Sequence, residues 1–173
     1  MTLTPARKLG LVLAAAVFGL DRFLKWLMIG PLNLREVGVI DLIPVFDLRW
    51  TENRGVSLGF LTAESDAMRW GLVALTAAIA VTVLVWLLRE HKRADILPLG
   101  LVLGGALGNI WDRAAYGYVV DYADLHFGTF RPFLIFNLAD AAITIGVLLI
   151  LARSFLSRDK RDDNDAGAPA TES

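Results

Sequence analysis

Two aspartates are the best candidates for chemistry in this chain. Asp140 lies in an apolar run from Phe133 to Ala152, which is twenty residues long and holds no other ionisable group. That is about the length a helix needs to cross a bilayer core, where a carboxylate costs roughly 2.5 kcal/mol or more and therefore indicates function. Asp121 lies shortly before the run, in VVDYADLHF. Two carboxylates that share one proton can activate a water molecule and polarise a carbonyl.

Other polar residues are predicted to gather near these acids. Several are spaced three or four residues apart, which places them on one face of a helix. An asparagine or arginine donor could orient a substrate or stabilise an oxyanion, although asparagines in membrane helices also serve as interhelical hydrogen-bonding groups. The candidates for contact with a substrate are Asn53, Asn109, Arg113 and Asn137, whereas Asp21 with Lys25 is expected to form a structural ion pair and Asp112 a structural contact.

The composition is typical of a membrane protein with several spans. The 173 residues are 55% hydrophobic and carry a net charge of -1, which gives no indication of nucleic-acid binding. There are no cysteines, so thiolate catalysis, disulfides and cysteine-based metal sites are excluded. The two histidines, His91 and His126, are too far apart in the sequence to predict a metal site. We expect neither a metal nor a cofactor.

Four apolar segments predict an all-α membrane protein with four transmembrane helices, at about 9–29, 70–88, 96–111 and 133–152. The first follows Arg7 and Lys8 like a signal peptide, but it leads into DRFLKW, so we interpret it as an uncleaved span. The third contains glycines at a spacing of four, which favours close helix packing in lipid. These are Gly100, Gly104 and Gly108.

Basic residues predict the orientation of the chain. They precede the first span, lie in the link between the second and third spans, and follow the fourth span. This pattern places both termini in the cytoplasm. The outer connections are then 30–69, where we expect a small β-sheet, and 112–132, where aromatic residues suggest a short interfacial helix. Residues 1–156 form one membrane domain, and the polar segment 157–173 is expected to be a disordered cytoplasmic tail.

Five motifs carry a resemblance to a known family. DRFLKW, TENRGVSLGF, GGALGNIWDR, VVDY and FNLAD occur in the order found in lipoprotein signal peptidase, also called signal peptidase II. The resemblance covers about residues 7–152. Two details depart from the family pattern: the loop reads Asn53-Arg54-Gly55-Val56-Ser57-Leu58 where N-x-G-A-A-F is usual, and Arg22 stands where glutamine is frequent.

The resemblance implies an intramembrane aspartic endopeptidase of the bacterial inner membrane. Such enzymes cleave diacylglyceryl-modified prolipoproteins just before the lipidated cysteine, near the outer face of the membrane, and globomycin inhibits them. The expected partners are therefore these substrates, membrane lipids and that inhibitor, with no nucleic acid, and we expect a monomer. The family pattern makes Asp121 and Asp140 catalytic, lines the site with Asn53, Asn109, Arg113 and Asn137, and assigns structural support to Asp21 and Lys25, to which we add Asp112 and Gly108.

Two alternatives from other classes stay open on the residues alone. A proton-coupled transporter or channel subunit would use Asp140 as a proton relay. Four spans without an evident internal repeat, and polar residues on one side only, argue against it. A non-enzymatic membrane adaptor would use the polar residues as interhelical contacts, but this gives no reason for two acids on the outer side.

Overall fold

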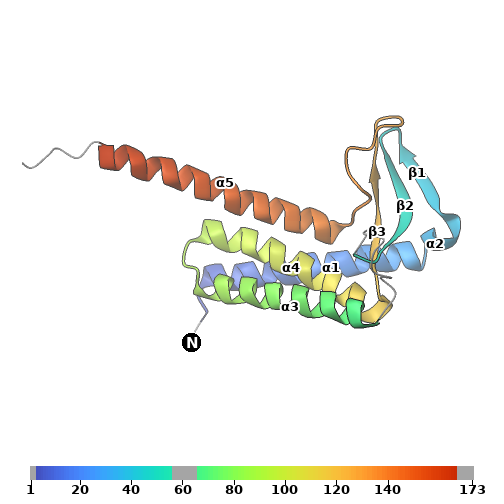
Figure 1. Cartoon of the computed structure of the whole chain (residues 1–173), viewed down its shortest axis with the longest axis horizontal. Helices are drawn as coiled ribbons and strands as arrows, with labels where there is room; N and C mark the ends of the chain where they lie inside the picture. The colour runs from blue at the N-terminus through green and yellow to red at the C-terminus, as the bar shows by residue number, and fades with distance from the viewer. Residues whose placement is uncertain (1–2, 56–65, 167–173) are drawn as a thin grey trace, which may run out of the picture.

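The computed structural model describes residues 3–55 and 66–166, with side chains described as far as Leu156. Within that part of the chain, long helices lie side by side and a small upright sheet covers one end of them (Figure 1). In Figure 1, α5 crosses the other long helices at an angle and extends beyond them. The elements are α1 (Pro5–Ile29), α2 (Leu34–Val37), β1 (Val39–Ile43), β2 (Phe46–Asn53), α3 (Asp66–Arg89), α4 (Arg93–Tyr116), β3 (Val119–Leu125) and α5 (Leu138–Ala166).

Helix α4 is the centre of the bundle and packs on α1, α3 and α5. Its glycines allow this close approach. A Cβ atom on Gly100 would lie 2.6 Å from the Gly10 carbonyl oxygen, and one on Gly104 would lie 2.5 Å from the Ala14 carbonyl oxygen, both on α1. The predicted packing role of the glycine spacing is therefore confirmed, because any side chain at these positions would push the helices apart.

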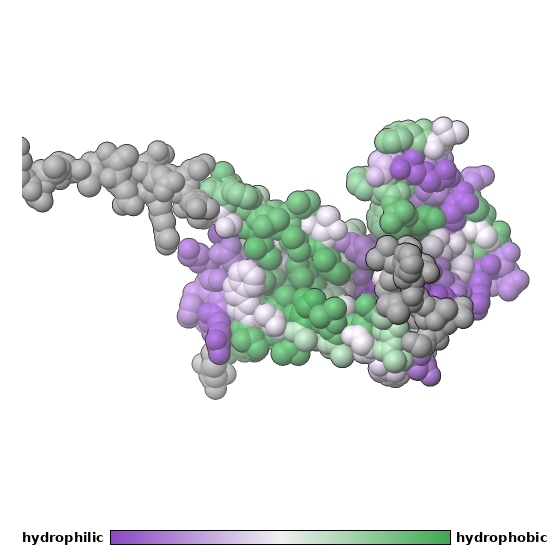
Figure 2. Space-filling model, viewed as in Figure 1, coloured by the Kyte–Doolittle hydropathy of each residue, from purple (hydrophilic) through white to green (hydrophobic). Residues whose placement is uncertain are grey.

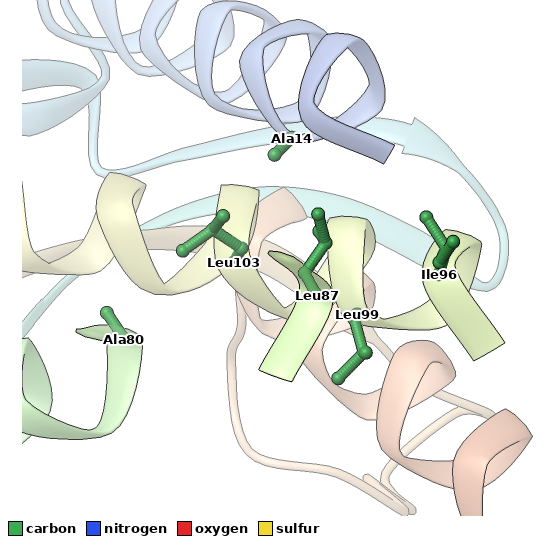
Figure 3. Close-up of a cluster of buried hydrophobic side chains, with 6 residues drawn as sticks. All are labelled: Ala14, Ala80, Leu87, Ile96, Leu99 and Leu103. Carbon is green, nitrogen blue, oxygen red and sulfur yellow. The ribbon is translucent and has the colours of Figure 1, made fainter. Parts of the chain in front are cut away.

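Apolar side chains fill the interior at the end of the bundle away from the sheet and also cover its exterior. Figure 3 shows the buried cluster, to which α1, α3 and α4 all contribute. Figure 2 shows a broad hydrophobic surface over the helices, with hydrophilic surface toward both ends. A soluble protein rarely exposes so large an apolar surface, whereas a bilayer solvates it. The buried cluster is Ala14, Ala80, Leu87, Ile96, Leu99 and Leu103.

Three helices in the described part of the chain are long and apolar enough to cross a membrane. These are α3, α4 and residues Leu138–Leu156 of α5. Helix α1 is 25 residues long. It is not among the three, since three charged residues lie close together in its second half. These residues are Asp21, Arg22 and Lys25.

The predicted small sheet is present, but it uses both outer connections. Strands β1 and β2 form an antiparallel hairpin, and β3 pairs with β2 in the order β1-β2-β3. The prediction of a short interfacial helix in 112–132 is wrong: that connection forms β3, and the short helix α2 lies in the first connection. The reason is packing, because Val119, Val120 and Tyr122 are buried in β3, where β-branched and aromatic residues are favoured.

The fourth apolar segment differs from its predicted helix at the start. Phe133 to Asn137 precede the helix, which begins at Leu138. Phe136 instead bonds to β3: its N–H donates to the Ala123 carbonyl over 3.1 Å, and its carbonyl accepts from the Ala123 N–H over 2.7 Å. Asp140 therefore lies in the first turn of α5 and not in the middle of a span.

The C-terminal segment also differs in part from the prediction. Helix α5 continues to Ala166, so residues 157–166 are helical where a disordered tail was expected. A helix that is already formed extends without a new nucleation cost, and this allows a polar sequence to continue it. The rest of the predicted tail, 167–173, lies outside the described residues.

Candidate active site

The fold brings Asp121 and Asp140 to opposite sides of one residue, Asn137. The Asn137 side-chain amide donates to Asp121 Oδ1 over 2.6 Å, and the Asn137 backbone N–H donates to Asp140 Oδ2 over 3.2 Å. Asp121 comes from the strand β3, and Asp140 comes from the first turn of α5. Hydrogen bonds donated by this one asparagine thus hold both carboxylates in place.

Asn137 and Asp140 also form the N-terminal cap of α5. The Asp140 N–H donates to Asn137 Oδ1 over 2.9 Å, while the Asp140 carboxylate accepts from the Asn137 N–H. This reciprocal pair is a capping box, which satisfies backbone N–H groups that a helix start would otherwise leave without partners. The carboxylate of Asp140 is therefore fixed by the local geometry that starts the helix.

Two more asparagines complete the polar contacts of the acids. Asn53, at the end of β2, donates through Nδ2 to Asp121 Oδ2 over 3.0 Å. Asn109, on α4, donates through Nδ2 to Asp140 Oδ1 over 2.8 Å. All three asparagines proposed from the sequence thus contact an aspartate: Asn53 ends β2, Asn109 lies on α4, and Asn137 directly precedes α5.

Arg113 lies on α4 four residues after Asn109, and therefore on the same side of the helix, and its side chain is near Gly55. A Cβ atom on Gly55 would lie 3.8 Å from Arg113 Nη2, and Gly55 adopts a φ of 89°, so a side chain there would be strained as well as crowded. Among the described residues, the buried Nε of Arg113 has no hydrogen-bond partner. Arg113 therefore offers a free donor beside the acids.

The environment of Asp121 favours the protonated form. Burial, followed by the charge of Asp140, raises the pKa of Asp121 to about 6, although the amides of Asn53 and Asn137 oppose the shift. Asp121 is 2% exposed. Burial likewise raises the pKa of the neighbouring Tyr122. Two like charges that resist joint ionisation are the expected electrostatic basis for a shared proton.

Beside the acids lies a buried ionic cluster, which we define as Asp21, Arg22, Lys25 and Asp112. Lys25 Nζ lies 3.0 Å from Asp21 Oδ2 and 2.7 Å from Asp112 Oδ2. Arg22 Nη1 lies 2.5 Å from Asp112 Oδ1. Gly108 makes room for the cluster, since a Cβ atom there would lie 2.5 Å from Asp21 Oδ2. The two charge signs balance within the cluster.

The two aspartates line two adjoining cavities of different character. Asp121 lines a cavity of about 700 Å³ beneath the ends of β2 and β3, where Glu52, Arg54 and Arg131 supply polar groups. Asp140 lines a mainly apolar cavity of about 310 Å³ along α5. Phe133 and Leu134 line both cavities. The cavity at Asp121 is thus the more polar of the two, and the acids lie where it meets the more apolar one.

Sequence reasoning did not assign roles to several residues that hold this site. Tyr122 accepts the Leu138 N–H at its hydroxyl over 3.3 Å, and Arg69 donates to the carbonyls of Arg113 and Ala114 at the end of α4. Arg22 was visible only as a departure from a motif. In the described residues, no group of three or more His, Cys, Asp or Glu side chains is arranged to hold a metal ion.

Comparison with known proteins identifies relatives over most of the chain. A family model described as signal peptidase (SPase) II matches residues 13–156. A lipoprotein signal peptidase of Sphingopyxis alaskensis is 50% identical over 163 residues, which cover 94% of each chain. Another, from Rhizorhabdus wittichii, is 54% identical over 155 residues, which cover 90% of each chain.

Solved structures agree with the fold. One described as a bacterial membrane enzyme matches with a TM-score of 0.72 at 26% identity, covering 84% of this chain and 92% of the other. A second with a similar description has a TM-score of 0.72 at 24% identity, covering 96% and 94% of the two chains, and supports the fold alone. From the family model and the two lipoprotein signal peptidases together, we conclude that the chain belongs to the signal peptidase II family and is a protease of the membrane.

Proposed function

We propose that this protein is an intramembrane aspartic endopeptidase that removes the signal peptide from diacylglyceryl-modified prolipoproteins by cleaving just before the lipidated cysteine. The observation that carries the proposal is the pair of aspartates, both bonded to Asn137, where the larger and more polar cavity meets the more apolar one. A lipid-anchored peptide has this same division, with acyl chains on one side of the cleavage point and polar polypeptide on the other.

The chemistry follows from one proton shared by Asp121 and Asp140. The ionised carboxylate takes a proton from a water molecule, and the oxygen of that water attacks the scissile carbonyl. The protonated carboxylate gives its proton to the carbonyl oxygen, which forms a tetrahedral intermediate. The intermediate then breaks its C–N bond as the carboxylate that took the proton from water passes it to the leaving amine, and the other carboxylate recovers its proton from the new carboxyl group. With a pKa of about 6, Asp121 exchanges its proton readily near neutral pH, as a general acid or base should.

The surrounding donors have separate roles in this mechanism. Asn53 and Asn109 hold Asp121 and Asp140 by direct hydrogen bonds. Arg113 carries a positive charge beside both acids and a buried Nε–H without a partner among the described residues, so it is suited to stabilise the oxyanion or to bind the substrate backbone.

The placement in the membrane follows from the same proposal. Helices α1, α3, α4 and α5 are the four spans, with both termini in the cytoplasm of a bacterial cell and the sheet at the outer face of the inner membrane. Burial of Asp21 and Lys25 inside the bundle explains how α1 can cross despite its charges. The protein acts as a monomer without a cofactor, and globomycin inhibits it by occupying the cavities at the aspartate pair.

The test is cleavage of a diacylglyceryl-modified prolipoprotein by detergent-purified protein. We expect wild type to cleave the lipidated substrate, and expect no cleavage of the unlipidated substrate or by the folded variants Asp121→Asn and Asp140→Asn. Cleavage by either folded variant at the wild-type rate would contradict the aspartic mechanism. A folded wild type that cleaves nothing would contradict the function itself.

A further inference from the structure

The buried ionic cluster contacts the backbone beside each catalytic aspartate. Asp112 Oδ2 accepts the Val120 N–H over 3.1 Å, and Val120 directly precedes Asp121. Asp21 Oδ1 accepts the Ala139 N–H over 3.2 Å, and Ala139 directly precedes Asp140. The strand that carries one acid and the helix that carries the other are thus each held by one carboxylate of the cluster.

Lys25 joins these two carboxylates. Its side chain is fully buried, and Nζ lies 3.0 Å from Asp21 Oδ2 and 2.7 Å from Asp112 Oδ2. In addition to these two ion pairs, Lys25 Nζ donates a hydrogen bond to Asn109 Oδ1 over 3.3 Å. Lys25 therefore connects the anchors of both aspartates with a residue of the site.

The bond to Asn109 determines which way its amide faces. Asn109 Oδ1 accepts from Lys25 Nζ and from Asn137 Nδ2, both over 3.3 Å, so Nδ2 is left to donate to Asp140 Oδ1. With the amide reversed, Nδ2 would face two donors and the oxygen would face a carboxylate. A donor directed at a carboxylate favours its ionised form.

We propose that Lys25 is a positioning residue of the catalytic pair, which sets the spacing of Asp121 and Asp140 and orients the Asn109 amide as a donor to Asp140. A structural ion pair alone would stabilise the bundle without determining which way the Asn109 amide faces. The inference depends on the proposed function only for its kinetic test.

The charged and titratable groups around the pair come from several elements. Of these, Lys25 is the cation bonded to a residue that itself bonds Asp140. The groups are Asp21, Arg22 and Lys25 on α1, Asp112 and Arg113 on α4, Tyr122 on β3, and Glu52, Arg54 and Arg131 at the polar cavity.

The chain offers a charge-balanced test in the double variant Asp21→Asn/Lys25→Met. It removes one charge of each sign and leaves Asp112 paired with Arg22, and the new asparagine can still accept the Ala139 N–H. The parent for comparison is the wild type, so the two proteins have the same net charge. The matched control is Asp95→Asn/Arg153→Met, which removes an ion pair of 2.6 Å between α4 and α5 outside the cluster.

We expect the double variant to stay folded, with KM near that of its parent and kcat lower by about 10²-fold, because small displacements of catalytic groups have effects of that size. We also expect the acidic limb of the pH–rate profile to move to higher pH, which a loss of stability alone would not cause. The control Asp95→Asn/Arg153→Met should lose stability without a shift in the acidic limb of its pH–rate profile. A folded double variant with the kcat and pH profile of its parent would overturn the proposal.

A second readout needs no substrate. The carboxyl infrared band that Asp121→Asn removes should titrate at higher pH in the double variant than in its parent, because the two acids are coupled, and an unchanged titration would overturn the proposal. If wild type cleaves no lipidated substrate, the proposed function fails while this titration still tests Lys25. If the double variant unfolds, Asn109→Leu decides, since it breaks the same connection and leaves the ion pairs intact. A folded Asn109→Leu protein with an unchanged titration would also overturn the proposal.

Discussion

Two buried polar regions lie next to each other in this protein and are built on different rules. In the ionic cluster, the carboxylates of Asp21 and Asp112 face the cations Lys25 and Arg22 at 2.5 to 3.0 Å. At the aspartate pair, the carboxylates of Asp121 and Asp140 receive hydrogen bonds from neutral amide groups, and neither acid has an ion pair among the described residues.

Under the proposed function, the difference separates a region that supports the structure from one that carries out the reaction. Opposite charges that compensate each other can be buried between helices and hold them in place. Two like charges held by neutral donors remain poised to exchange a proton, which is reflected in a pKa of about 6 for Asp121. The same residue type thus has two roles according to whether a cation faces it.

The largest expected effect is at the aspartate pair. Asp121→Asn or Asp140→Asn should lower the cleavage rate by roughly 10²–10⁴ or more, because each removes a group that transfers or holds the catalytic proton. Both variants should remain folded, since the amide is nearly the same shape and needs no counter-ion. Initial cleavage rates measure the loss of activity, and thermal unfolding in the same detergent measures whether the variants stay folded. An unfolded Asp140→Asn protein would contradict the expectation that the variants stay folded.

Removing one acid of the ionic cluster should lower stability strongly. Asp112→Asn leaves Arg22 and Lys25 with one buried carboxylate between them and should lower the free energy of unfolding by about 3–5 kcal/mol. Equilibrium unfolding in a denaturing detergent measures this loss. The comparison is Glu52→Gln, whose carboxylate pairs with exposed arginines, Arg35 and Arg54, and should contribute about 1 kcal/mol or less. Equal losses of unfolding free energy in Asp112→Asn and Glu52→Gln would contradict the distinction between the buried and the exposed ion pairs.

Stability should depend on pH through Asp121. Its folded pKa is raised from 3.8 to about 6, so between those values the folded state binds a proton that the unfolded state has released. The free energy of unfolding should therefore fall as pH rises through this window, by on the order of 1–3 kcal/mol. Hydrogen bonds from Arg131 and Arg49 outweigh burial and lower the pKa of Asp124. Asp124 therefore changes the pH dependence of stability only at lower pH. Unfolding of wild type and Asp121→Asn at several pH values tests this, and an equal slope in the variant would contradict it.

A smaller effect is expected where the cluster meets the helix packing. Gly108→Ala would place a methyl group against the Asp21 carboxylate and should destabilise by about 1–3 kcal/mol, through overpacking. Gly19→Ala is the matched control, because nothing lies within 4 Å of its Cβ position, and it should be neutral or slightly stabilising. Thermal unfolding of both variants compares the two positions directly.

The smallest effect is expected at the C-terminus. Removal of residues 157–173 should leave cleavage nearly unchanged, because α5 contacts the site only through its first turns. Activity of the truncated protein beside wild type measures this, and a folded but inactive truncation would indicate a contribution from the tail.

Much of this arrangement could be predicted from the sequence. The charge pattern and the unbroken apolar runs indicate helices in a membrane, because such runs have few other stable environments. The spacing of Asp21 and Lys25, four residues apart on one helix, predicts their ion pair directly. Asp121 and Asp140 stand out because a carboxylate in or beside an apolar run is costly and therefore indicates a function.

Other features depend on contacts between distant segments. Pairing of Phe136 with Ala123 keeps Phe133 to Asn137 out of the helix, and no hydropathy pattern contains that information. Pairing with β2 likewise makes Val119–Leu125 a strand in a connection where aromatic residues suggested a helix. In both cases backbone hydrogen bonds to a remote segment outweigh local preference.

The sequence by itself determined the helical membrane class, the acids and their candidate donors, because residue type and local spacing carry that information. Only the tertiary structure decided that Asn137 contacts both aspartates, that Asp140 begins a helix, and that Lys25 connects the ionic cluster with Asn109. The physical reason is that hydrogen bonds are short and directional, so partners separated by tens of residues along the chain are chosen by packing.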